Sequence, residues 1–197
     1  RRFDASMLDL GQGAQQALTQ MRPAARRLAE QAARNGVDCF IQADAAGLDT
    51  FYRLHPERWA NARTFCSQRF IEVLMQYAPK DLEIWFTRKQ GVIIAGAIVL
   101  YGTQEAYVWL TVLGDGVMPL RAFSAFHIAG VKAAAARGMR WYNLGSSEGL
   151  PDVRRLKEAL GVPAVPYVRL ALEKGAFKVY RRWREGGEQR RGLAASF

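Results

Sequence analysis

Three strand-like stretches follow one another in the middle of the chain, and a helix and a further strand come after them. LEIWFTR (82–88), VIIAGAIVLY (92–101) and AYVWLTVLG (106–114) are rich in β-branched and aromatic residues and are separated by short turns. Short turns join antiparallel strands, whereas a strand–helix–strand connection produces a parallel pair. Because the helix predicted over 119–136 leads into a strand predicted over 140–145, the sequence predicts an α/β fold with a mixed sheet: an antiparallel meander plus one parallel crossover.

A polar loop, GSSEG (145–149), follows the second strand of the predicted parallel pair. Where antiparallel pairing gives way to parallel pairing, the carboxyl ends of the strands border a crevice that commonly binds ligands. In one interpretation, Ser146 and Ser147 bind substrate through hydrogen bonds and Glu148 accepts a proton from an attacking amine. In the other, the loop is a flexible joint that caps the next helix.

The other predicted elements surround this sheet. A helix is predicted over residues 12–35, with either a kink or the start of a second helix at Pro23. Further strands are predicted over 37–42 and 166–173, and further helices over 48–62, 64–78, 151–160 and 176–185. We therefore expect an N-terminal helical connecting segment over 1–36, a domain over 37–185 and a flexible tail over 186–197.

The charge of the chain narrows the choice of partners. A formal net charge of +10 on 197 residues favours a polyanionic partner such as nucleic acid, a phosphate-bearing cofactor or an acidic membrane surface, although it also favours solubility. Cys39 and Cys66 are isolated and the chain has two histidines, so we expect neither a disulfide framework nor a metal site. His127 lies on the apolar stripe of its predicted helix, which favours a core position.

The cysteine pattern also bears on the compartment. It predicts a reducing cytoplasm, with peripheral attachment at the inner membrane face as the alternative. The longest apolar run, VIIAGAIVLY, is shorter than the roughly 20 residues that a bilayer-spanning helix needs, so we expect no transmembrane segment. The chain opens at Arg1 rather than Met, which leaves a lost leader or upstream domain open.

This order of elements resembles the GNAT acyltransferase fold. Four stretches resemble its Fem-like branch more specifically: ARRLAEQAARNGVDCFI, LDTFYRLHPERW, GVIIAGAIVLY and AARGMRWYNLGSSEGLPDVRRLKEALG. That branch includes the peptidoglycan-bridge aminoacyltransferases and many bacterial acetyltransferase-like proteins. Its members usually carry two such domains in tandem, so the resemblance implies that this chain is the second domain and that an N-terminal domain is missing.

The resemblance also implies roles for particular residues. The helix after the loop typically reads Phe-Lys-x-x-Phe-Gly in this branch, and LKEALG retains Lys157 and Gly161. Lys157 would then stabilise a phosphate or a developing oxyanion, although its helix could also present it to solvent. Asn143 stands where the branch often has an aspartate. The implied catalytic residues are Lys157, Asn143 and Glu148, and the implied substrate-binding residues are Tyr142, Ser146, Ser147 and Arg154.

The donor-binding loop departs from the wider fold. Acetyl-CoA-binding members carry a glycine-rich loop whose amides hold pyrophosphate at a helix N-terminus. Here LGDGVMPL keeps Gly114 and Gly116, but Asp115 would repel phosphate and Pro119 removes an amide donor. We therefore expect no tightly bound cofactor, with acyl-CoA or another acyl thioester as co-substrate. The residues expected to contact the donor are Thr111, Val112, Leu113, Gly114 and Gly116.

Two functional hypotheses follow. The first is an N-acyltransferase that moves an acyl or aminoacyl group to an amine acceptor from acyl-CoA, acyl carrier protein or aminoacyl-tRNA. The strand YVWLTVL offers no acidic side chain, so we expect positioning of the reactants to contribute more than a dedicated base. The second is a catalytically silent module that binds nucleic acid or a protein partner through its basic helices.

Overall fold

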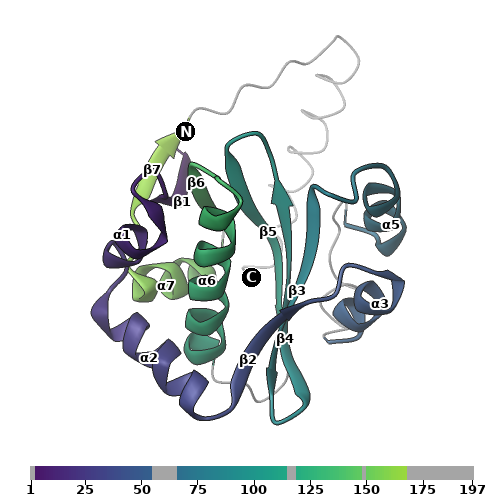
Figure 1. Ribbon diagram of the computed structural model, residues 1–197, viewed down its shortest axis with the longest axis horizontal. Helices are drawn as coiled ribbons and strands as arrows, with labels where there is room; N and C mark the ends of the chain where they lie inside the picture. Colours follow the sequence, from purple (N-terminus) through teal and green to yellow (C-terminus); the bar gives the residue numbers. More distant parts are fainter. Residues whose placement is uncertain (1–2, 55–65, 115–118, 148–149, 168–197) are drawn as a thin grey trace, which may run out of the picture. The chain divides into compact units, whose positions relative to one another are not determined.

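The computed structural model describes residues 3–54, 66–114, 119–147 and 150–167. Residues 1–167 form one compact unit. Figure 1 shows a seven-stranded sheet with the strand order β2-β3-β4-β5-β6-β1-β7. The strands are β1 (Phe3–Asp9), β2 (Val37–Ile41), β3 (Leu82–Lys89), β4 (Val92–Tyr101), β5 (Glu105–Leu113), β6 (Trp141–Ser146) and β7 (Ala164–Tyr167). The described helices are α1 (Gly13–Thr19), α2 (Pro23–Arg34), α3 (Ala45–Arg53), α5 (Gln68–Tyr77), α6 (Pro119–Ala136) and α7 (Pro151–Leu160).

The predicted mixed sheet is confirmed. Strands β2 to β5 pair antiparallel in succession, and α6 then crosses over so that β5 and β6 run parallel. Proline occupies the first turn of α2, α6 and α7, where its missing N–H costs no helical hydrogen bond. Gly161 ends α7 with a φ of 76°, a left-handed conformation that glycine adopts without strain. Local signals of this kind account for the agreement between the predicted and observed order.

The structure adds one strand that the sequence analysis did not predict. Strand β1 was not predicted, and it lies between β6 and β7, pairing antiparallel with both. Its sequence, FDASMLD, has the weak strand propensity of Asp and Ser, so the two neighbouring strands rather than local preference hold it in place. Of the two alternatives at Pro23, the start of a second helix is confirmed, because α1 ends at Thr19 and α2 begins at Pro23. The predicted helix over 176–185 and the predicted tail lie outside the described residues.

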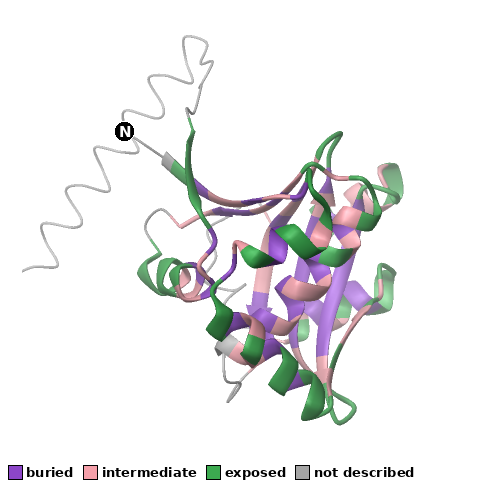
Figure 2. Ribbon diagram, turned by 60° about the vertical axis from the view of Figure 1, so that its left-hand side comes forward, coloured by how far each residue is buried: buried purple, intermediate pink, exposed green. Residues whose placement is uncertain are grey.

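Helices cover both faces of the sheet. Helices α1, α2, α6 and α7 lie on one face, and α3 and α5 lie on the other (Figure 1). Alternation along β3 supplies both layers: Trp85 packs on the α6 face, while Ile84 and Phe86 pack on the α3 face. Figure 2 shows the buried residues concentrated along the strands and the inner sides of the helices. Within the described residues, no helix is long and apolar enough to span a bilayer.

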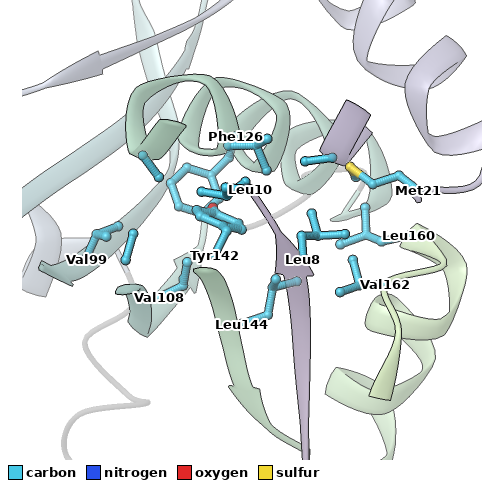
Figure 3. Close-up of a cluster of buried hydrophobic side chains, with 14 of the residues drawn as sticks. Leu8, Leu10, Met21, Val99, Val108, Phe126, Tyr142, Leu144, Leu160 and Val162 are labelled. Atoms are coloured by element: carbon cyan, nitrogen blue, oxygen red, sulfur yellow. The ribbon is translucent and has the colours of Figure 1, made fainter. Parts of the chain in front are cut away.

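The larger core cluster surrounds Tyr142 of β6. Figure 3 shows Tyr142 beneath Phe126 of α6 and beside Leu10, and Leu8 and Leu160 lie toward α7. A Cβ atom at position 130 of α6 would collide with the Tyr142 hydroxyl, so glycine at this position lets helix and strand approach. The core therefore anchors β6 to α6 and α7, the elements on which the predicted site depends.

Candidate active site

Strands β5 and β6 are hydrogen-bonded only where they begin. Their recorded pairs are Glu105 with Trp141, Ala106 with Tyr142, and Tyr107 with Asn143. Beyond Tyr107, β5 continues to Leu113, and its edge toward β6 has no strand partner among the described residues. Free N–H and C=O groups along such an edge can bind an extended ligand. The two strands are therefore not paired over their whole length, as the predicted crevice requires.

A bulge in β5 contributes to this separation. Ile98 of β4 pairs with Leu110 and Val99 pairs with Val108, which leaves Trp109 as the extra residue. The bulge also reverses the alternation of side chains: Val108 packs on the α6 face, whereas Leu110 packs on the α3 face. Of the predicted donor-contacting residues, Val112 is buried on the α3 face, while Thr111 and Leu113 lie beside Phe123 of α6.

The end of β6 turns at Gly145. Its φ is 73°, and a Cβ atom there would lie 3.1 Å from the Tyr107 ring, so both backbone conformation and space favour glycine. The Asn143 side chain accepts a hydrogen bond from the Gly145 amide at 2.7 Å and so stabilises the turn. The register between β1 and β6 shifts at the same place, between Ala5 and Met7. The carbonyls of Gly145 and Ser146 are thereby directed at α7.

Lys157 of α7 donates hydrogen bonds to these two carbonyls. The residue is 5% exposed, and its Nζ donates to the Gly145 oxygen at 2.8 Å and to the Ser146 oxygen at 3.1 Å. No carboxylate among the described residues pairs with it. Burial lowers the pKa of Lys157 to about 8, so the side chain is mostly protonated at neutral pH. The alternative in which the helix presents Lys157 to solvent is therefore wrong. Arg154 and Arg155 on the same helix are exposed.

The opposite face of the same strands carries a carboxylate that the sequence analysis missed. Tyr107 and Asn143 are cross-strand partners, and the Asn143 amide donates to the Glu105 carboxylate at 3.3 Å. Burial raises the pKa of Tyr107, and Tyr167 and Glu105 add to the shift. Glu105 directly precedes the strand predicted over 106–114, so the sequence alone places it in the turn. Its spacing of two residues from Tyr107 was the available signal, because residues i and i+2 of a strand share a face.

The hydrogen bond between Asn143 and Glu105 gives a physical reason why this chain has asparagine at position 143, where the Fem-like branch often has aspartate. An aspartate there would place a second carboxylate at about the 3.3 Å that now separates the Asn143 amide from Glu105. Two carboxylates so close repel each other, whereas the neutral amide donates to one. Glu105 therefore supplies the carboxylate on this face, and a carboxylate is a side chain that can accept a proton from an amine.

Tyr142 lies apart from this face. It is fully buried, and its hydroxyl is 3.0 Å from Nδ1 of His127. Burial lowers the pKa of His127 to about 3, with the charge of Lys157 adding to the shift, so the imidazole is neutral. His127 is 1% exposed, in agreement with the predicted core position. Tyr142 consequently faces the core beneath α6 rather than the side where Glu105 and Tyr107 lie.

Five further residues were predicted to belong to the site: Gly114, Gly116, Ser146, Ser147 and Glu148. Ser146 and Ser147 are partly exposed at the end of β6, and the Ser146 carbonyl is one of the two that Lys157 contacts. Glu148 and Gly116 lie outside the described residues. The Gly114 amide donates to the Ile94 carbonyl at 2.9 Å, so this amide is already used within the sheet. The described residues contain no cluster of His, Cys, Asp or Glu suited to a metal ion.

The acetyltransferase (GNAT) domain family matches residues 15–149, and the chain belongs to this family. No curated protein sequence matches the chain.

Solved structures agree on the fold. The crystal structure of FemX superimposes with a TM-score of 0.67 at 10% identity, covering 84% of this chain and 61% of FemX. A ribosomal-protein-alanine N-acetyltransferase from Brucella melitensis biovar Abortus 2308 gives 0.54 at 17% identity, covering 71% of this chain and 99% of that one. An aminoglycoside N-acetyltransferase in complex with CoA gives 0.54 at 14% identity, covering 71% and 95%. The resemblance to the Fem-like branch is thus confirmed in fold.

Proposed function

We propose that this domain is a Fem-type N-acyltransferase that moves an acyl or aminoacyl group from an activated donor to an amine. The observation that carries the proposal is the separation of β5 and β6 beyond Tyr107, with a buried cation on one side and a carboxylate on the other. In the arrangement we propose, an activated carbonyl lies between the separated strand ends, and its two reactants approach from opposite sides.

The donor occupies the α6 and α7 side of the crevice. The unpaired edge of β5 near Thr111 aligns the donor through main-chain hydrogen bonds, as a neighbouring strand would. The CoA complex of the structurally similar aminoglycoside N-acetyltransferase supports acyl-CoA as one donor. Acyl carrier protein and aminoacyl-tRNA are the others, and the degenerate phosphate loop predicted from LGDGVMPL favours them over acetyl-CoA bound in the usual manner.

Lys157 acts on the donor side through charge. Attack on an ester or thioester carbonyl develops negative charge on its oxygen, and a fixed cation in a site shielded from water stabilises that charge. Lys157 is held by the carbonyls of Gly145 and Ser146, so it needs no reorganisation during the reaction. It also positions the turn at the end of β6. The site we propose includes Ser146 and Ser147 at the crevice mouth and Arg154 beside it, and omits the buried Tyr142.

Glu105 acts on the acceptor side. An ammonium must lose a proton before it can attack, and Glu105 is positioned by Asn143 to accept that proton. Phe70 and Trp109, whose ring centroids are 6.1 Å apart, contribute aromatic surface to the same face. The acceptor is an amine on a cell-envelope precursor or on a small amino compound. We place the reaction in the cytoplasm, where these donors are made.

The test is a transfer assay on the whole chain. Acyl-CoAs and charged tRNA are each incubated with a panel of amines, and products are identified by mass spectrometry. Glu105→Gln is expected to lower kcat/KM by about a hundredfold or more, because general bases contribute at least that much. Glu158→Gln, an exposed glutamate on α7, is the matched control and should leave the rate unchanged.

Two outcomes would count against this function. A folded chain that forms no acyl product with any donor would contradict it. Binding of nucleic acid with steep salt dependence and no transfer product would favour the silent binding module instead.

A further inference from the structure

A cavity of about 480 Å³ lies between α1, α2, α6 and β2. No residue of β5, β6 or α7 lines it, and β2 is the edge strand four places from β6 in the sheet. Its volume falls within the range of small-molecule sites, about 300–1,000 Å³. The cavity is therefore separate from the crevice between the splayed strands, and acyl transfer as proposed above does not use it.

The walls of the cavity are apolar. Ala29 of α2 and Ala129 of α6 face it, and their small side chains leave the space between the two helices open. Leu18, Ile128 and Cys39 complete the apolar surface. Such a surface suits an aliphatic chain, whose burial is favourable in proportion to its area.

The rim of the cavity is cationic and incompletely paired. Arg26 and Lys132 line it, and neither forms an ion pair with a described residue. The Nε atom of Arg26 is buried and has no hydrogen-bond partner. Buried donors are normally satisfied, so this one calls for an acceptor. Glu30 is also at the rim, which leaves one net positive charge there.

We propose that this cavity binds an amphiphilic oxyanion, with a carboxylate or phosphate monoester head at Arg26 and Lys132 and a short aliphatic chain over the alanines. A guanidinium donates two parallel hydrogen bonds to either head group, which accounts for the shared chemistry. The lining between α2 and α6 accommodates the chain. The site takes a free metabolite-sized ligand and is independent of the acceptor and donor sites.

Calorimetric titration of the whole chain with octanoate and octyl phosphate tests the proposal. Binding of either supports it, and the better ligand identifies the head group. Octylamine has the same chain with opposite charge, and it should not bind. Failure of both anions to bind, or equal binding of octylamine, would overturn the proposal.

Thiol labelling locates the ligand. Cys39 lines the cavity and Cys66 does not, and burial raises the pKa of both thiols, so alkylation is followed in alkaline buffer by mass spectrometry. At a ligand concentration ten times Kd, alkylation of Cys39 should slow by about tenfold while that of Cys66 is unchanged. Binding without protection of Cys39 would place the ligand elsewhere and contradict the proposal.

Substitutions test the head-group contact. Arg26→Gln should weaken binding of the preferred anion by about tenfold or more, the effect of losing a charge-assisted hydrogen bond. Arg27→Gln is the matched control, because Arg27 is exposed on the same helix and does not line the cavity. Ala129→Leu fills part of the cavity and should weaken binding without altering charge. Equal affinities for the Arg26 and Arg27 variants would refute the assignment.

Discussion

The two ends of the β5–β6 pair handle buried charge differently. At the end where the strands are paired, the Glu83 carboxylate accepts from Tyr101 Oη at 2.6 Å and from Trp85 Nε1 at 2.8 Å, and it pairs with Arg137. The Arg137 guanidinium also lies 4.0 Å from the Tyr101 ring centre. At the end where the strands separate, Lys157 is buried against two carbonyls without a carboxylate partner among the described residues.

The different pairing of Glu83 and Lys157 indicates which end stabilises the fold and which end is suited to a functional site. A buried carboxylate with three donors is satisfied and holds α6 to β3 and β4, so the paired end is built for stability. A buried cation that only carbonyl dipoles compensate is costly, and proteins keep such groups mostly where function requires them. The separated end therefore has the features of a site and the paired end those of a scaffold.

Among the substitutions, the largest expected effect on stability comes from breaking the paired end. Glu83→Ala leaves Arg137, Tyr101 and Trp85 without their common acceptor, and we expect the free energy of unfolding to fall by about 3 kcal/mol. Chemical denaturation measures this change. Glu72→Ala, which removes an exposed partner of Arg69, should cost less than about 1 kcal/mol. Similar losses for the two variants would remove the distinction drawn for Glu83.

Substitution at the separated end should change acyl-transfer activity more than it changes stability. Lys157→Met removes the cost of burying a charge but leaves the Gly145 and Ser146 carbonyls without their donor, so we expect the free energy of unfolding to fall by about 1 kcal/mol, less than for Glu83→Ala. If the proposed function holds, kcat/KM for acyl transfer should fall by about a hundredfold, a typical cost of losing oxyanion stabilisation. Lys89→Met, an exposed lysine, is the control. A stability loss as large as that of Glu83→Ala would make Lys157 a structural residue instead.

Acid should destabilise the region beside Lys157 through His127. In the unfolded chain this imidazole takes up a proton near pH 6.5, whereas in the folded protein its pKa is about 3. The unfolded state therefore binds more protons between these values, and stability is lost as pH falls, by about 1.4 kcal/mol per pH unit. The measurement is the free energy of unfolding against pH for wild type and His127→Asn. Parallel curves would show that His127 titrates normally.

The smallest effect is expected at an exposed ion pair near the paired end. Arg140 contacts Asp9 at 3.1 Å, with the two side chains 52% and 40% exposed. Because water competes for both groups, Arg140→Ala should cost less than about 1 kcal/mol. The loss should shrink further in high salt. Thermal unfolding at two salt concentrations measures it, and a salt-independent loss would point to packing of Arg140 on the Trp141 ring instead.

The sequence predicted only part of the candidate site. It predicted the separated strands, because the change from antiparallel to parallel pairing is readable along the chain. It singled out Lys157 only through the resemblance of LKEALG to a family motif. It missed Glu105, which lies 38 residues from its partner Asn143. It also grouped Tyr142 with Asn143, although neighbouring residues of a strand point to opposite faces. Each miss concerns which side of the sheet a side chain occupies.

The sequence by itself determined the order of the helices and strands that follow β1, the mixed sheet and the turns at proline and glycine, since these depend on neighbours within a few residues. Only the tertiary structure decided that β1 enters the sheet, that Lys157 is buried, and that Asn143 holds Glu105. These features depend on strand register and on irregularities at Trp109 and Gly145. A shift of one residue reverses every side chain beyond it, and what sets the shift lies in other strands.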